Sequence, residues 1–292
     1  MILIAHFGVG GIRLKFGIYT NPQKDKKYAA TKKVLAALNE AGCDVYYDAL
    51  TARGLGLAAF RDAKECDVLF VLGGDGTILQ AAHKYVRCDI ALVGINFGRL
   101  GFMSEIDIDG IVPFIRTVLA GKYRIDERTM LKTRVPRVDE PVLALNDFII
   151  TKQSRSKMIR LDLYVNGSHA EHYIGDGLIV STPTGSTAYS MSAGGPIISP
   201  DIACMLITPI CPHSMHARSI VANCTDEITV MCVDTAGKVG ISADGRKEMP
   251  FMKGDAITIT TADIKTKFLR VEADNFYSHL KRKLAQWNRT DN

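Results

Sequence analysis

The sequence lacks several features that mark whole classes of protein. No stretch approaches the roughly 18 consecutive apolar residues that identify a membrane-spanning helix, so we expect no membrane partner. The N-terminal segment has neither a basic leader nor a small-residue cleavage site, and we expect no secretory signal peptide. The seven cysteines are odd in number and form no CxxC pair. Most of them lie in apolar segments, which favours a reduced, cytoplasmic compartment.

Concentrated charge is also scarce. The formal net charge of +5 is mild for 292 residues, and Lys and Arg are spread along the chain. We find no basic stripe of the kind that follows a nucleic-acid backbone, so no nucleic-acid partner is expected. The short charged clusters at residues 24–27 and 279–283 are interpreted as solvated surface. The length of the chain fits two domains of moderate size.

Residues 1–122 alternate between predicted strands and predicted helices. Strands are expected at residues 15–21, 43–48, 67–72 and 90–96, and helices at residues 27–41, 78–86 and 111–119. The segment 67–72 is almost wholly apolar, as in a strand that is covered on both faces. Strands separated by helices imply parallel pairing. This part of the chain is therefore predicted to be an α/β domain with a parallel sheet.

The pattern changes near residue 123. Apolar residues alternate with polar ones from Ile159 to Val165, and Asn166 and Gly167 then give a strong hairpin-turn signal. We see no helix of useful length between residues 123 and 262, so these residues are predicted to form a second, all-β domain. Residues 263–292 are expected to rejoin the first domain, with a C-terminal helix over residues 275–287 that packs back on it.

The segment with the clearest chemistry is Gly73-Gly74-Asp75-Gly76-Thr77, between an apolar strand and a helix. Ligands of open α/β sheets bind beyond the carboxyl ends of the strands, where this loop must lie. Glycines let the backbone approach a bulky anion, and the free N–H groups of the next helix suit phosphate. We therefore predict a loop for the phosphate donor at residues 73, 74, 76 and 77, with Thr77 capping the helix.

Asp75 does not fit a phosphate loop, because its carboxylate repels phosphate. It should face a hydroxyl group or a metal instead. A capping Asp in a tight strand-to-helix turn is the plain structural alternative for this motif. The segment is no P-loop, since no GK[ST] follows. The other glycine-rich stretch, Gly8-Val9-Gly10-Gly11, precedes the first clear strand and has Arg13 in place of the third glycine of a dinucleotide fingerprint, so we treat it as a decoy.

The glycine segment resembles the signature of a kinase superfamily that includes NAD kinases, diacylglycerol and sphingosine kinases, and 6-phosphofructokinases. A second segment, GDGLIVSTPTGSTAYS at residues 175–190 with SAGGP at 192–196, is very similar to the NAD kinase family motif. Physically it is a strand that leads into a hydroxyl-rich loop with an aromatic face at Tyr189. On composition alone, a Ser/Thr-rich turn with a buried Tyr is the alternative.

Further segments resemble the same family in the same order, and together the resemblance covers roughly residues 15–285. They are GINFGRLGFMS at 94–104, the pair Asn146-Asp147, ITPICPHSMHAR at 207–218, and the turn Asp244-Gly245-Arg246. Two departures are visible. Asp147 stands where the family has Glu, one methylene longer, and Ser219 stands where Pro is usual.

The resemblance implies an NAD kinase, in which Asp75 is the general base for in-line transfer of a phosphoryl group to the 2′-hydroxyl of the adenosine ribose of NAD. The donor would be ATP or polyphosphate, with Mg²⁺ or another divalent metal arriving with ATP, and we assign no protein ligand to the metal. A homodimer or homotetramer is also implied. The implied substrate-binding residues are Asp75, Gly76, Phe102, Asn146, Asp147, Lys157, Asp176, Thr184, Thr187, Ala188, Tyr189, Ser190, Met191, Ser192 and Arg246.

Other functions stay open at this stage. A lipid kinase of the same superfamily would need an apolar channel and a membrane-facing surface, and the polar TPTGSTAY stretch argues against it. A non-catalytic NADP sensor would not need Asp75. The pairs His213/His216 and His169/His172 have metal-like spacing but no third ligand nearby in the sequence, so we assign no metal site. Cys211 is expected to be a buried structural cysteine.

Overall fold

The structure is a computed structural model that describes residues 14–58, 60–96, 101–153, 157–235, 237–271 and 276–287. The chain forms two compact units, one from Met1–Glu127 with Thr266–Asn292 and the other from Arg128–Lys265. The second unit is thus an insertion between two parts of the first. The domain limits expected from the sequence, after residues 122 and 262, lie a few residues away. The observed limits, after Glu127 and Lys265, fall within two long strands, β6 and β17, which therefore contribute residues to both units.

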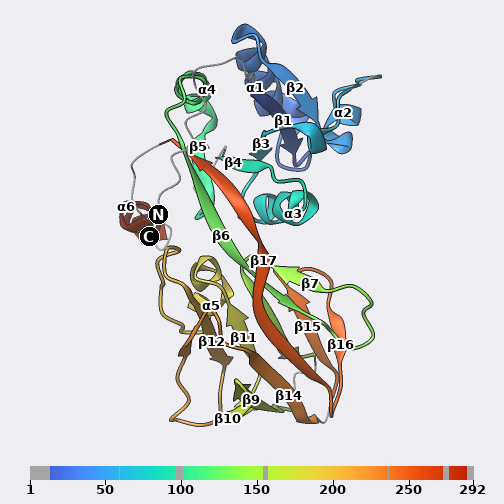
Figure 1. The fold of residues 1–292 in the computed structure, drawn as a ribbon, viewed down its shortest axis with the longest axis vertical. Helices are drawn as coiled ribbons and strands as arrows, with labels where there is room; N and C mark the ends of the chain where they lie inside the picture. The colour runs from blue at the N-terminus through green and yellow to red at the C-terminus, as the bar shows by residue number, and fades with distance from the viewer. Residues whose placement is uncertain are drawn as a thin grey trace. The chain divides into compact units, whose positions relative to one another are not determined.

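The first unit is an α/β unit, as predicted (Figure 1). Its strands are β1 (Lys15–Thr20), β2 (Asp44–Tyr47), β3 (Val68–Leu72), β4 (Ala91–Asn96), β5 (Ser104–Asp107) and the end of β17 (Ala256–Arg270). Its helices are α1 (Ala29–Glu40), α2 (Ala49–Gly54), α3 (Asp75–Tyr85), α4 (Ile111–Leu119) and α6 (Phe276–Trp287).

The sheet of this unit is parallel, in the order β17–β4–β3–β1–β2. The first residues of β4 pair with the end of β17, and its last residues pair with β5 on the same edge. Every residue of β3 and β4 is buried, which explains why the sequence of β3 is wholly apolar. Side chains of α1 and α4 pack on these strands in one core, which also contains Leu269 of β17.

The predicted strands and long helices of this unit are confirmed. Helix α1 ends as expected before Gly42, which has a φ of 69°. Helix α2 was not predicted; it has six residues and is capped by Asp48, whose side chain accepts from the Leu50 amide. The glycine-rich decoy at residues 8–11 and the four residues 97–100 of the GINFGRLGFMS segment lie outside the described residues.

The second unit contains two antiparallel sheets, as predicted for an all-β domain. Its strands are β6 (Arg124–Thr133), β7 (Val142–Ala144), β8 (Asp147–Lys152), β9 (Ile159–Val165), β10 (Ser168–Gly175), β11 (Gly177–Ser181), β12 (Cys204–Ile210), β13 (Ile220–Asn223), β14 (Ile228–Thr235), β15 (Val239–Ala243), β16 (Met249–Phe251) and the first part of β17.

One sheet has the order β13–β12–β11–β8–β15–β16, and the other includes β10–β9–β14–β17. Their inner faces share one apolar core, to which β8 contributes Phe148 and Ile150 and β9 contributes Leu161 and Leu163. The β9–β10 hairpin turns at Asn166 and Gly167, both with positive φ, as the sequence predicted.

The hydroxyl-rich segment after β11 contains a 3₁₀ turn at Thr184–Thr187 and a single helical turn, α5, at Tyr189–Ser192 (Figure 1). One expectation for this unit is wrong. Cys211 is exposed rather than buried, because it directly follows β12 in a turn where its own φ is 44°. All seven cysteines lie in the described residues, and each is a free thiol. Among the described helices, none is long and apolar enough to cross a membrane.

Candidate active site

The glycine segment lies where the buried strand β3 meets helix α3. The Gly73 amide donates to the carbonyl of Ile95 in β4 at 3.1 Å, and helix α3 begins at Asp75. A Cβ on Gly73 would lie 2.3 Å from the Thr77 hydroxyl, so only glycine fits there. Gly74 is the N-cap residue and provides no side-chain cap for the helix. The Thr77 amide donates to the Gly74 carbonyl at 2.8 Å, and the amides of Asp75 and Gly76 are the ones available to an anion.

Thr77 does not cap helix α3, in contrast to the prediction. It stands in the first turn, with its side chain buried beneath Gly73. Its hydroxyl oxygen accepts from the Asn21 side-chain amide at 3.3 Å. Asn21 directly follows β1, the neighbour of β3 in the sheet. Thr77 thus links the glycine segment to the end of the adjacent strand β1 by a hydrogen bond, and its buried side chain packs against Gly73.

Among the described residues, Asp75 is held by backbone amides, and no charged partner of its carboxylate is found there. The Phe102 amide donates to Asp75 Oδ2 at 2.9 Å, and the Met103 amide donates to Oδ1 at 3.2 Å. Gly101 makes this approach possible, because a Cβ there would lie 1.9 Å from Oδ1. A carboxylate has about four lone-pair sites, so these two bonds leave acceptor capacity for another hydrogen-bond donor.

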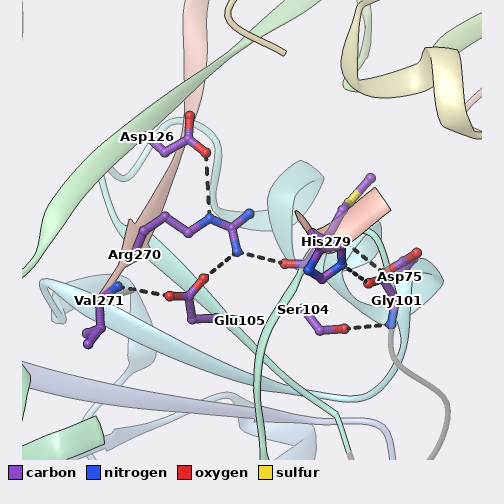
Figure 2. Close-up of polar contacts among 9 residues, drawn as sticks. Asp75, Gly101, Ser104, Glu105, Asp126, Arg270, Val271 and His279 are labelled. Atoms are coloured by element: carbon purple, nitrogen blue, oxygen red, sulfur yellow. Dashed lines mark hydrogen bonds and ion pairs between the residues drawn. The ribbon is translucent and has the colours of Figure 1, made fainter. Parts of the chain in front are cut away.

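The loop of residues 101–103 that holds Asp75 is itself fixed by an ion-pair network (Figure 2). Arg270, at the end of β17, pairs with Glu105 at 2.7 Å and with Asp126 at 3.5 Å. The same guanidinium contacts the Met103 carbonyl at 3.4 Å. The side chains of Arg270, Glu105 and Asp126 are only 10 %, 8 % and 9 % exposed. The buried guanidinium therefore compensates charge on both carboxylates.

Two charged clusters that were interpreted as solvated surface also reach this site. Lys24 has its ammonium nitrogen 3.2 Å from the position that a Cβ on Gly74 would take, so it lies directly against the glycine segment. His279 of α6 has Nε2 2.7 Å from the Gly101 carbonyl oxygen. The interpretation is therefore wrong for His279, whose ring has a partner in the tertiary structure, whereas Lys24 is exposed and agrees with it.

In the second unit, the predicted pair Asn146-Asp147 is organised by Asp244. The Asp244 carboxylate accepts from the amides of Leu145, Asn146 and Asp147 at 2.8, 2.7 and 3.0 Å. Asp244 and Gly245 adopt positive φ values of 51° and 65° in the turn that points this carboxylate at the segment. Asn146 is only 6 % exposed, and its Oδ1 has no hydrogen-bond partner among the described residues. Such a buried acceptor needs a donor from elsewhere.

Asp147 is 2 % exposed and stands beside a second carboxylate. Burial, followed by the charge of Asp244, raises the pKa of the Asp147 carboxyl to about 7. The folded chain therefore keeps this proton up to about neutral pH, whereas an unfolded Asp loses it near its ordinary value of 3.8. The contribution of Asp147 to the free energy of unfolding should therefore be most favourable below pH 3.8. It should decrease as the pH rises from 3.8 to about 7.

Asp147→Asn should remove this pH dependence. At pH 8 the variant is expected to exceed the unsubstituted chain in free energy of unfolding by an amount on the order of 3–4 kcal/mol, and the difference should vanish near pH 4. Urea unfolding of both proteins between pH 4 and pH 8 measures it. Asp201→Asn, at an exposed position, is the control and should shift neither curve. A pH-independent difference for Asp147→Asn would contradict the assignment.

The hydroxyl-rich segment after β11 packs directly on the Asn146 backbone. Thr182 donates to the Leu145 carbonyl at 2.6 Å, and a Cβ on Gly185 would lie 2.1 Å from the Asn146 carbonyl oxygen. Ser190 is fully buried and bonds to Thr208 at 2.8 Å, so its hydroxyl is used inside the unit. Tyr189 is 42 % exposed, in contrast to the alternative of a buried Tyr, and its ring is accessible to a ligand.

The remaining predicted binding residues have varied surroundings. Asp176 pairs with Lys152 at 2.6 Å, a lysine that the sequence did not single out. Arg246 donates to the Leu143 carbonyl at 2.9 Å. Lys157 is exposed just before β9. The partly buried members are Phe102, Thr187, Ala188 and Met191, Thr184 is buried, and Gly76 and Ser192 are exposed. The roles of all these residues as ligand contacts stay predictions.

Comparison with known proteins gives one family for both units. The family described as ATP-NAD kinase N-terminal domain matches residues 16–123, and the one described as ATP-NAD kinase C-terminal domain matches residues 145–271. An NAD kinase from Natranaerobius thermophilus is 38 % identical over 277 residues, which covers 92 % of this chain and 97 % of the relative. One from Desulforamulus reducens is 38 % identical over 279 residues, covering 93 % and 97 %.

Two solved structures are similar to the whole chain. An NAD kinase from Archaeoglobus fulgidus in complex with ATP has a TM-score of 0.74 and 25 % identity, and covers 94 % of this chain and 99 % of its own. A yeast NADH kinase complexed with NADH has a TM-score of 0.83 over 94 % of this chain and 88 % of its own. At 22 % identity, the yeast protein supports the fold alone.

Proposed function

The chain belongs to the NAD kinase family, and from this premise we propose that it transfers the terminal phosphoryl group of ATP to the 2′-hydroxyl of the adenosine ribose of NAD, which yields NADP. The observation that carries the proposal is the Asp75 carboxylate, held at the start of α3 by the amides of Phe102 and Met103. Within the described part of the chain no cation neutralises this carboxylate, and two backbone amides orient it, so it can act on a sugar hydroxyl.

In this mechanism Asp75 accepts a hydrogen bond from the 2′-hydroxyl and takes its proton as the 2′-oxygen bonds to the γ-phosphorus. The bond from that phosphorus to the β–γ bridging oxygen breaks at the same time, and ADP leaves. The two backbone amides fix the direction of the carboxylate before the substrate arrives. Phosphoryl-transfer transition states are loose, so positioning and charge neutralisation contribute most of the rate. A positioned general base typically adds about 10²–10⁴-fold.

The donor phosphates are proposed to bind at residues Gly73, Gly74, Gly76 and Thr77. The uncapped amides at the start of α3 supply donors for the phosphate oxygens, and the ammonium group of Lys24 supplies positive charge beside Gly74. Mg²⁺ is proposed to arrive with ATP and to offset phosphate charge. The described residues contain no group of three or more His, Cys, Asp or Glu side chains that could hold a metal by themselves.

Residues of the second unit are proposed to bind the dinucleotide. Asn146 supports this role, because its buried Oδ1 is an acceptor that a ligand N–H or O–H group can satisfy. The exposed ring of Tyr189 can stack on a base. The other proposed contacts in this unit are Asp147, Lys157, Asp176, Thr184, Thr187, Ala188, Ser190, Met191, Ser192 and Arg246. In the first unit, Gly76 and Phe102 are proposed contacts of the substrate. We further propose that the protein is a homodimer or homotetramer. We also propose that it works in the cytoplasm, because its seven cysteines are free thiols, as expected in a reducing compartment.

Product analysis tests the proposed reaction. The purified chain is incubated with NAD, ATP and Mg²⁺, and NADP is quantified by chromatography. We expect NADP formation that requires both ATP and Asp75. Exchange of ATP for polyphosphate, or of NAD for NADH, then defines the donor and the acceptor. Failure to form NADP from NAD, or NADPH from NADH, with either donor would contradict the proposal, as would phosphorylation of diacylglycerol or sphingosine instead.

Gly76→Ala distinguishes an effect on ATP binding from an effect on folding stability. Gly76 is exposed in the first turn of α3, and a Cβ there would meet nothing within 4 Å. Alanine should leave stability unchanged or raise it by up to about 1 kcal/mol. If donor phosphates contact this backbone, however, the methyl group should lower kcat/KM for ATP by about tenfold or more. Steady-state kinetics and urea unfolding measure both effects.

The matched control for this substitution is Gly110→Ala. Gly110 precedes α4, with a φ of −86° and nothing within 4 Å of its Cβ position. It should change neither kinetics nor stability by a measurable amount. A Gly76→Ala variant with an unaltered KM for ATP and an unaltered kcat would show that the glycine segment does not carry the donor.

A further inference from the structure

Helix α6 contacts the loop of residues 101–103 through one turn of its surface. His279 Nε2 lies 2.7 Å from the Gly101 carbonyl oxygen, and the His279 ring lies 6.3 Å from the Phe102 ring. Lys283, four residues later on the same face, has its ammonium nitrogen 5.4 Å from the centre of the Phe102 ring. Because a carbonyl oxygen can only accept, Nε2 of His279 must carry the proton in this contact.

The Gly101 carbonyl and the Phe102 amide are the two ends of one peptide group. His279 Nε2 donates to the Gly101 oxygen of this group (Figure 2), and the Phe102 N–H at its other end donates to Asp75 Oδ2 at 2.9 Å. A peptide group is planar and rigid, so fixing its oxygen also fixes the direction of its N–H. A hydrogen bond at the oxygen also polarises the group and strengthens the bond that the N–H makes.

The other amide that holds Asp75 is supported from a different side. Arg270 contacts the Met103 carbonyl, and its partner Glu105 accepts from the Val271 amide at 2.9 Å. The ion-pair network therefore fixes the C-terminal end of the 101–103 loop. Its N-terminal end, at Gly101, is fixed by His279 and by the Ser104 hydroxyl, which accepts from the Gly101 amide at 3.1 Å.

We propose that His279 is a positioning residue for the reaction, which orients the Gly101–Phe102 peptide so that this peptide holds the Asp75 carboxylate towards the acceptor hydroxyl. The proposal rests on the function proposed above. It gives helix α6 a part in turnover, although His279 itself contacts neither substrate. Small displacements of a reacting group cost large factors in rate, so loss of this one donor should be measurable in kcat.

The test compares three substitutions of His279 in the full-length protein. His279→Ala should lower kcat by about 5- to 50-fold and leave KM for ATP and NAD within about twofold. His279→Phe retains the ring packing on Phe102 but has no donor, and should lose as much. His279→Gln places an amide N–H near the position of Nε2 and should recover kcat to within about threefold of the unsubstituted chain. Lys281→Ala, exposed on the same helix, is the control and should have no effect.

A double-mutant cycle with Asp75→Asn separates positioning from general structural damage. If His279 acts through Asp75, His279→Phe should not further lower the residual rate of Asp75→Asn. An equal loss in both backgrounds, no recovery with Gln, or a kcat for His279→Phe within twofold of the unsubstituted chain would each overturn the proposal. Should His279→Ala not fold, the Phe and Gln variants decide the matter. Failure of the proposed function is separate, because the unsubstituted chain would then form no NADP.

Discussion

Asp75→Asn is expected to yield a folded protein whose kcat for NADP formation falls by about 10²–10⁴-fold. The substitution removes the group that takes the proton of the 2′-hydroxyl. It also affects the support of the side chain, because both carboxylate oxygens accept backbone amides. Asparagine has only one oxygen, so its NH₂ group must face a backbone N–H. We expect a loss of about 1–3 kcal/mol in the free energy of unfolding.

Steady-state assays, calorimetric titration with NAD and urea unfolding measure these effects together. NAD should still bind to the variant, since the proposed contacts in the second unit are untouched. Asp109→Asn is the matched control, because it makes the same chemical change at an exposed carboxylate paired with Lys33, and it should leave kcat unaltered. If Asp75→Asn retained kcat within threefold, Asp75 would have no part in the chemistry.

Arg270→Met is expected to have the largest effect on stability. Methionine fills much of the same volume but removes the guanidinium with which the buried carboxylates of Glu105 and Asp126 both pair. Removing one partner from a buried ion-pair network typically costs about 3–5 kcal/mol. Chemical unfolding should show this loss. The kcat should fall as well, because the Met103 carbonyl loses the contact that supports the loop holding Asp75.

Lys267→Met provides a control on the same strand. Lys267 pairs with Asp89, whose side chain is 80 % exposed, and the loss of an exposed pair should cost less than about 1 kcal/mol. An Arg270→Met variant as stable as Lys267→Met would contradict the view that the buried network stabilises the first unit. A variant with lower stability but unaltered kcat would instead show that the Met103 contact has no role in turnover.

The sequence predicted those parts of the fold in which a local pattern reports directly on burial. Strand β3 is apolar at every position because both of its faces are covered, and Asn166-Gly167 adopts the positive φ values that such a turn requires. Helix α2 was missed for a related reason. With six residues it is too short to display a helical period, and it depends on the Asp48 cap.

The candidate site was only partly predictable. Asp75 was singled out by the pattern of an apolar strand, glycines and a helix, which is local in the sequence, whereas Asn146 was proposed only from the resemblance to a family. His279 contacts a residue 178 positions away, and Arg270 pairs with one 165 positions away. No local pattern reports such contacts, and a short run of charged residues is usually solvated. Asp244 stands in a turn that was recognised, but its three bonds to the segment 145–147 depend on sheet pairing.

The insertion of the second unit between two parts of the first has a consequence for biosynthesis. During translation, the glycine segment and strand β4 emerge early, whereas Lys267 and Phe268, which complete the edge of β4, emerge only after the whole inserted unit. Until then Glu105 has no counter-charge, and the nascent first unit exposes apolar edge positions to chaperones. A ribosome that stalled before Arg270 would therefore release a chain that carries the reacting carboxylate but lacks the support that holds it.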